Sequence, residues 1–265
     1  MIFRQLFDPE TSTYSYLLGD ESTRQAVLID SVAEQFDRDV LLLRELELEL
    51  AYALETHVHA DHVTASGRLR EALGCKVGVG ALSGVTNADV LLEDGGVVRY
   101  GERELRVVST PGHTNGCVTY VDDAAGAAFT GDVLLIRGCG RTDFQQGDAA
   151  ELFSSVRTRL FTLPDDTRIH PGHDYRGRMM STVAEEKRFN LRISPDRNVD
   201  EFVEVMRGLD LAYPKKMDVA VPANLQSGLV SDTQTAERGA EAVSVADVME
   251  RHGRQDAEAW VGYSI

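Results

Sequence analysis

The chain has 265 residues, enough for one large domain or two small ones with a sizeable hydrophobic core. Hydrophobic residues make up 43% and charged residues 26%, which is typical of a soluble globular protein and excludes a disordered or fibrous chain. The formal net charge of −16 has the wrong sign for a protein whose main partner is nucleic acid or an anionic membrane. No membrane-spanning run or secretion signal is visible, so we expect a cytoplasmic protein without a membrane partner.

The first half of the chain is predicted to consist mainly of short strands separated by turns. Strands are expected over residues 2–7, 12–18, 24–29 and 51–55, with a helix over 33–46 before the last of them. A second helix is expected over 64–73, because the following Gly74 favours a helix end. Further short strands are expected at 76–79, 97–100, 104–109, 117–121, 127–130 and 133–136.

The second half is predicted to be mainly helical, with helices over 149–160, 179–188 and 199–207. A polar stretch over 227–241 is interpreted as a linker, and one last helix is expected over 243–251. Strands followed by clustered helices favour a sandwich of sheets flanked by helices over a doubly wound parallel sheet. We therefore expect one domain over residues 1–225 and a partly helical C-terminal extension over 226–265.

The histidines are concentrated in particular segments of the chain. His57, His59, Asp61 and His62 lie within six residues, directly after a predicted buried strand. Imidazole and carboxylate groups are the usual protein ligands of zinc and iron. This run therefore predicts a metal site on the loop that leaves the strand.

Three further groups of the same kind follow other predicted strands. His113 and His173 each lie in a Pro-Gly-His turn, and Asp132 follows an apolar run and a glycine. Active-site loops normally lie at strand ends, so we expect these residues to meet the first group there. Either one or two metal ions would be compatible with this set, because Asp132 can serve as the bridging carboxylate of a two-metal site.

In this order the four motifs resemble those of the metallo-β-lactamase-like hydrolases and oxygenases, over roughly residues 1–225. The resemblance implies an α+β protein with the αββα metallo-β-lactamase sandwich, in which two mixed β-sheets are flanked by helices and the metal site lies at one edge. It also implies one metal position lined by His57, His59, His113 and Asp132, and a second lined by Asp61, His62, His173 and the shared Asp132.

Three further stretches are similar to one branch of that superfamily, the persulfide dioxygenases. They are GCGRTDFQ over 138–145, HPGHDYRG over 170–177 and VAVPAN over 219–224. This resemblance implies one Fe(II) per chain, held by His57, His113 and Asp132 with open positions for O2 and a sulfur anion. The remaining motif residues, His59, Asp61, His62 and His173, would then orient the ligands or bind a second metal.

The implied reaction is the oxidation of the terminal sulfur of glutathione persulfide to sulfite, with O2 as co-substrate and glutathione as the released product. It would serve sulfide detoxification, with a functional link to sulfide oxidation and sulfurtransferase enzymes. The alternative is a glyoxalase II-type dinuclear hydrolase of S-acylglutathione thioesters, which shares only the GCG of the first stretch. A third hypothesis, a non-catalytic sulfur-binding module, is disfavoured by the complete set of metal ligands.

The substrate-binding residues are predicted partly from charge. Residues 168–192 carry six basic and three acidic side chains in an otherwise acidic chain, and glutathione presents two carboxylates that suit arginine. We predict that Tyr175, Arg141, Arg192 and Lys187 bind the substrate, and that Tyr175 and Arg141 also take part in catalysis. For Arg141 the alternative is an ion pair with Asp143 or Asp148 that holds its loop, and for Lys187 it is a solvated helix face. We also expect a homodimer.

Overall fold

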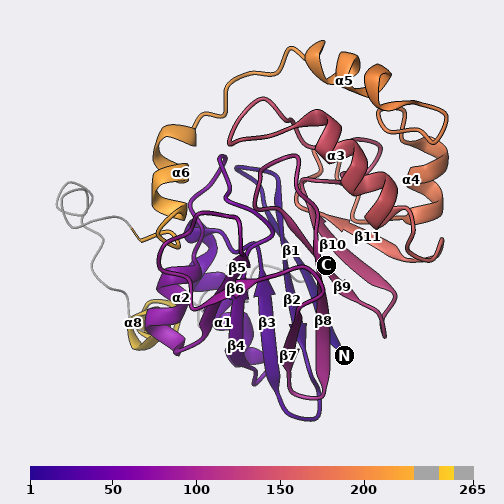
Figure 1. Cartoon of the computed structure of the whole chain (residues 1–265). Coiled ribbons are helices and arrows are strands. Elements are labelled where there is room, and N and C mark those ends of the chain that lie inside the picture. Colours follow the sequence, from indigo (N-terminus) through magenta and orange to yellow (C-terminus); the bar gives the residue numbers. More distant parts are fainter. Residues whose placement is uncertain (230–244, 254–265) are drawn as a thin grey trace, which may run out of the picture.

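The computed structural model describes residues 1–229 and 245–253. Two six-stranded sheets pack face to face, and helices cover the outer face of each sheet (Figure 1). Both sheets are mixed, because each contains antiparallel and parallel neighbours. The arrangement confirms the predicted α+β sandwich flanked by helices.

The first sheet has its strands in chain order. β1, β2 and β3 pair antiparallel, whereas β3, β4, β5 and β6 pair parallel. Its strands are β1 (Ile2–Asp8), β2 (Thr13–Gly19), β3 (Gln25–Ile29), β4 (Glu49–Leu54), β5 (Lys76–Gly80) and β6 (Val90–Leu92).

The second sheet also follows chain order, and its neighbours are antiparallel except for the parallel pair β10 and β11. Its strands are β7 (Val97–Tyr100), β8 (Arg103–Ser109), β9 (Val118–Asp122), β10 (Ala127–Gly131), β11 (Arg168–Pro171) and β12 (Ser181–Thr182). The parallel pair matters for the site, because it brings the carboxyl ends of β10 and β11 to the same edge.

Helices on the two outer faces complete the layers. The first sheet is covered by η1 (Ala33–Gln35), α1 (Phe36–Glu45), α2 (Ser66–Leu73) and α8 (Val245–Gly253). The second is covered by α3 (Ala149–Ser155), η2 (Val156–Leu160), α4 (Val183–Phe189) and α5 (Val199–Arg207). Helix α6 (Met217–Asn224) lies beside α2, at the edge of the first sheet (Figure 1).

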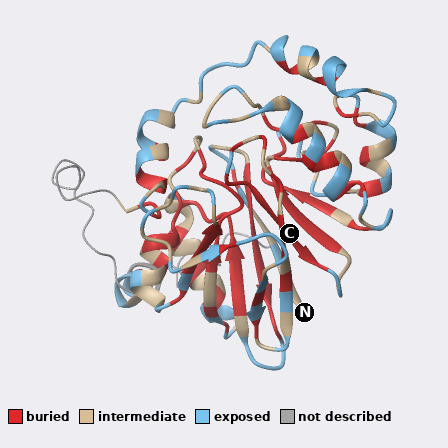
Figure 2. Cartoon of the chain, viewed as in Figure 1, coloured by how far each residue is buried: buried red, intermediate tan, exposed pale blue. Residues whose placement is uncertain are grey.

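Three layers of apolar side chains hold these elements together. The layer between the sheets contains the fully buried rings of Tyr16, Tyr100, Tyr120 and Phe129. The two other layers lie between each sheet and its helices, so buried residues follow the strands and exposed ones the outer helix faces (Figure 2). Such burial of apolar surface is the main favourable contribution to folding.

Some predicted elements differ from the observed ones. The strand predicted over 133–136 is wrong: the chain turns back there, and the amides and carbonyls of Leu135 and Gly138 bond each other. The helix predicted over 179–188 begins only at Val183, because β12 precedes it and Thr182 caps its first turn. Strands β6, β11 and β12 and helix α6 were not predicted.

The predicted C-terminal extension is described in part. Residues 230–244 of the segment interpreted as linker and last helix lie outside the described residues. Helix α8 packs on α1, and Val248 is fully buried there. No helix in the described ranges has the length and apolar character that a membrane crossing requires. The three cysteines are free and buried.

Candidate metal centre

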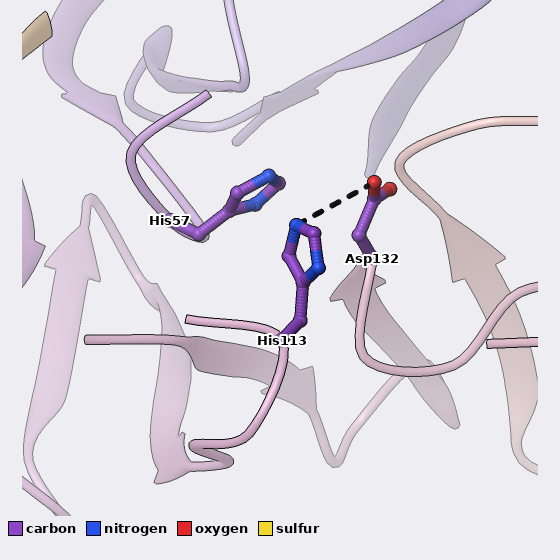
Figure 3. Close-up of side chains that lie close together, drawn as sticks. All are labelled: His57, His113 and Asp132. Atoms are coloured by element: carbon purple, nitrogen blue, oxygen red, sulfur yellow. Dashed lines mark ion pairs between the residues drawn. The ribbon is translucent and has the colours of Figure 1, made fainter. Parts of the chain in front are cut away.

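Three of the predicted ligands come together at one edge of the sandwich. His57 follows β4 of the first sheet, whereas His113 and Asp132 follow β8 and β10 of the second. Each offers one ligand atom, and these atoms lie within 4.8 Å of one another. Figure 3 shows the three side chains pointing toward one another, with His113 Nε2 at 3.8 Å from Asp132 Oδ2.

The two histidines are oriented by hydrogen bonds to their Nδ1 atoms. Thr56 Oγ1 donates to Asp30 Oδ2 at 2.8 Å, so it accepts from His57 Nδ1 at 2.9 Å. His113 Nδ1 donates to the carbonyl of Arg141 at 2.6 Å. In both rings Nε2 is therefore the nitrogen left for a metal, in the arrangement that fixes metal-binding histidines.

The protonation states suit metal binding. Burial, together with the neighbouring His59 and His113, lowers the pKa of His57 well below its usual value, so its ring is neutral. Burial alone would raise the pKa of Asp132, but the nearby His173 outweighs it and keeps the pKa below the usual range. Metals bind neutral imidazole and ionised carboxylate, which are the forms favoured here.

Asp132 is held by a chain of side chains behind it, in which His173 and His62 are buried and Asp61 is half-buried. His173 Nδ1 lies 2.7 Å from Asp132 Oδ1, and its Nε2 lies 3.0 Å from Asp61 Oδ2. Asp61 Oδ2 in turn lies 2.9 Å from His62 Nδ1. Burial opposes the charged form of His173, but the two carboxylates overcome it and raise its pKa well above the usual value. Both ring nitrogens of His173 are thus engaged in orienting carboxylates.

The ring of His59 lies beside that of His57, with centroids 4.1 Å apart, but one of its nitrogens is close to two carboxylates. Its Nε2 lies 3.1 Å from Glu55 Oε2 and 3.3 Å from Asp30 Oδ1. Its Nδ1 is buried without a hydrogen-bond partner, as is Nε2 of His62. His59, Asp61 and His62 also form a group whose ligand atoms lie within 4.8 Å. The donor set therefore fits one metal at His57, His113 and Asp132, and a second metal would have neighbouring nitrogens to bind.

A cavity of about 540 Å³ opens in front of the three ligands. Its walls are apolar at Leu135, Ile136, Phe144, Leu211 and Pro214. Five arginines also line it, namely Arg137, Arg141, Arg176, Arg178 and Arg192. A cavity of this kind suits an anionic molecule with an apolar part and places that molecule beside the metal ligands.

Three of the four predicted substrate-binding residues line the cavity. Tyr175 is 74% exposed, and its ring stacks on His173 with centroids 6.0 Å apart. Arg192 donates to the carbonyl of Cys139 at 2.8 Å. Arg141 pairs with both carboxylate oxygens of Asp143 at 2.7 Å and donates to Ala212, so it holds its loop as the alternative interpretation expected.

Lys187 is not brought to the cavity, contrary to the prediction. It lies on α4, and its Nζ pairs with Asp165 at 2.6 Å. Lys187 was predicted to bind substrate because other basic residues lie near it in the sequence. A helix directs successive side chains to different faces, so proximity in the sequence did not place Lys187 at the cavity. Arg176 and Arg178, which do line the cavity, belong to the same basic segment but were not singled out.

Asp30 was also missed by the sequence analysis. It is 1% exposed and accepts from both the amide and the hydroxyl of Thr56, at 2.7 and 2.8 Å. Its only sequence signal is a position directly after a buried apolar run, which other acidic residues of the chain share. Its role depends on the parallel pairing of β3 with β4, which brings the ends of both strands together.

Comparison with known proteins agrees with this fold and site. The model of the metallo-beta-lactamase superfamily matches residues 8–173, so the chain belongs to that superfamily. The crystal structure of ETHE1 from Myxococcus xanthus superposes with a TM-score of 0.84 and 51% identity, covering 86% of this chain and 100% of that one.

Curated relatives narrow the assignment. Human mitochondrial persulfide dioxygenase ETHE1 is 50% identical over 234 residues, which is 88% of this chain and 91% of the relative. A probable metallo-hydrolase of Burkholderia pseudomallei is 33% identical over 88% of this chain and 95% of its own. The chain belongs to the persulfide dioxygenase family and is an enzyme of the dioxygenase class. These relatives do not support the glyoxalase II alternative better than they support the persulfide dioxygenase.

Proposed function

We propose that this enzyme oxidises glutathione persulfide with O2 at a single Fe(II) held by His57, His113 and Asp132. The observation that carries the proposal is the convergence of these three ligand atoms within 4.8 Å in a chain of the persulfide dioxygenase family. Two histidines and one carboxylate are the ligand set of non-haem iron oxygenases. When bound, Fe(II) supplies open positions at which O2 and a soft sulfur anion can meet.

The surrounding side chains have separate tasks in this proposal. Thr56 and the carbonyl of Arg141 keep the Nε2 atoms of the two histidines directed to the metal. His173 holds Asp132 in place and neutralises part of the negative charge behind it. Tyr175 and Arg176 are exposed residues that line the cavity, where they would contact the persulfide and its carrier.

The decisive experiment for the proposed function is anaerobic purification followed by metal analysis and an oxygen-electrode assay. We expect about one iron per chain and O2 uptake that depends on glutathione persulfide, with sulfite as product. Two zinc ions per chain, no O2 uptake and hydrolysis of S-acylglutathione would refute the proposal and favour the dinuclear hydrolase.

Arg176 is the arginine of the cavity best placed to bind a substrate carboxylate. It is exposed, and its guanidinium makes no hydrogen bond or ion pair within the described part of the chain. We expect Arg176→Ala to raise KM for glutathione persulfide about fivefold, as for one exposed ion pair, with kcat little changed. Steady-state O2 uptake measures both constants.

Lys187→Ala is the matched control for Arg176→Ala. Its ammonium pairs with Asp165 away from the cavity, so KM is expected to stay at the wild-type value. A raised KM in Lys187→Ala with an unchanged KM in Arg176→Ala would exchange the two assignments. We further propose a cytoplasmic homodimer with a functional link to sulfide oxidation and sulfurtransferase enzymes. Gel filtration tests the dimer, and cell fractionation tests the location.

A further inference from the structure

The loop that carries the first metal ligand has little regular structure of its own. We call residues 55–64 the histidine loop; within it only Thr64 forms a β-bridge, to Val32. Most of its residues are buried, including His57, His59 and His62. Buried backbone groups need hydrogen-bond partners, so this loop depends on side chains from other parts of the fold.

Asn224, the last residue of α6, supplies several of those partners. Its side chain is buried, and its Nδ2 donates to the carbonyls of His59 and His62 at 2.9 and 2.8 Å. Its Oδ1 accepts from the amide of Thr64 at 2.9 Å. One amide group thus binds the backbone of the histidine loop at three places, about 160 positions away in the sequence.

The segment that follows α6 packs closely on the same region. The amide of Gly67 donates to the carbonyl of Ser227 at 2.8 Å. Gly228 has a φ of +78°, and a Cβ on it would lie 2.0 Å from the carbonyl oxygen of Thr64. Only glycine allows this approach. Figure 1 shows α6 next to α2, the helix that follows the histidine loop.

Other contacts hold the histidine loop at both of its ends, and near its end the amide of Ala33 donates to the carbonyl of Val63 at 2.8 Å. Asp30 holds Thr56, and Gln145 donates to the carbonyl of Val58 at 2.7 Å. Asn224 differs from these anchors in binding three backbone groups of the loop with one side chain, all of them after His57. It also fixes the backbone on both sides of Asp61, which orients His173 and through it Asp132.

We infer that Asn224 is a positioning residue for the metal, acting on His57 through the loop and on Asp132 through Asp61 and His173. The inference rests on the proposed metal site. It makes helix α6, which lies beyond the superfamily match at residues 8–173, a part of the metal centre. Retention of the metal then depends on a segment near the C-terminal end of the described chain.

The test is the rate at which the full-length, iron-loaded protein releases iron to a chelator under anaerobic conditions. Asn224→Asp keeps the size of the side chain but replaces its two donors by an oxygen that faces two carbonyls. Groups that support metal ligands are worth about 10- to 100-fold in metal affinity, so we expect release to be faster by about that factor. Gly228→Ala, which leaves Asn224 intact but forces the segment off Thr64, is expected to accelerate release as well.

Asn87→Asp is the matched control. Its Nδ2 donates to the carbonyl of Gln226 at 3.0 Å in an exposed contact, so the same chemical change affects the same segment without touching the histidine loop. Release from this variant is expected to match the wild type. The thermal midpoints of the metal-free and iron-loaded forms are measured in parallel, because a positioning role reduces the difference between them.

Two results would overturn the inference. One is unchanged iron release in Asn224→Asp, with the thermal midpoints of both forms lowered equally. The other is failure of both Asn224→Asp and the milder Asn224→Ser to fold without metal when the metal-free wild type folds, since Asn224 would then serve the fold itself. A wild type that binds no iron would instead refute the proposed function, so the two failures are distinguishable.

Discussion

Asp132→Ala is expected to retain less than about a tenth of the wild-type iron, because a lost ligand costs more than the 10- to 100-fold effect of an outer group. Persulfide-dependent O2 uptake should disappear with the iron. The change removes one of the three converging ligand atoms and leaves the buried His173 without its partner at 2.7 Å. Metal analysis after anaerobic purification, together with the oxygen electrode, measures both effects.

Asp122→Ala is the control for this experiment. Asp122 is the buried last residue of β9 in the second sheet, and it pairs with Arg103 at 2.8 Å outside the lining of the cavity. We expect this variant to lose stability and to keep its iron. A full iron content in Asp132→Ala would show that Asp132 is not a ligand and would remove the basis of the proposed triad.

Asp30→Ala is expected to reduce both the stability of the protein and its iron content. The change leaves the buried amide and hydroxyl of Thr56 without an acceptor and removes one carboxylate from His59. Breaking a buried charged network by removing one partner typically costs about 3–5 kcal/mol. Urea unfolding of the metal-free protein measures this cost, and metal analysis shows whether His57 still binds when Thr56 is released.

Asp20→Ala separates the two effects of the Asp30 change. Asp20 likewise accepts hydrogen bonds from neighbouring backbone and hydroxyl groups, including the amide of Glu102, but in a turn that does not line the cavity. We expect the Asp20→Ala variant to have a lower free energy of unfolding and an unchanged iron content. If Asp30→Ala keeps the full iron content, then the link from Asp30 through Thr56 does not orient His57.

The convergence of the three proposed ligands could be predicted because their chemistry is local. His57, His113 and Asp132 stand directly after predicted strands, and the ends of neighbouring strands meet at one edge of a sheet. Strands β6, β11 and β12 have only two to four residues, too few to show a period of their own, and they are defined by their neighbours. Helix α6 was not predicted because Pro222 lies in its interior, and proline normally indicates a helix end.

The supporting residues could not be predicted in the same way. Asn224 and Asp30 act on the histidine loop from other elements. The stretch VAVPAN marked Asn224 only by its resemblance to a family, and no local pattern indicated the contacts that either residue makes. Lys187 shows the opposite error, because its charge fitted the expected substrate but its helix face directs it to Asp165. Side-chain direction is decided by tertiary packing, which the residue type and the neighbouring sequence do not contain.

The origin of the three proposed ligands in two different sheets has a consequence for the stability of the fold. His57 follows a strand of the first sheet, and His113 and Asp132 follow strands of the second. A bound ion would therefore cross-link the two sheets of the sandwich. A ligand that binds only the native state stabilises it by mass action. Loss of the ion would therefore stop the reaction and lower the free energy of unfolding together.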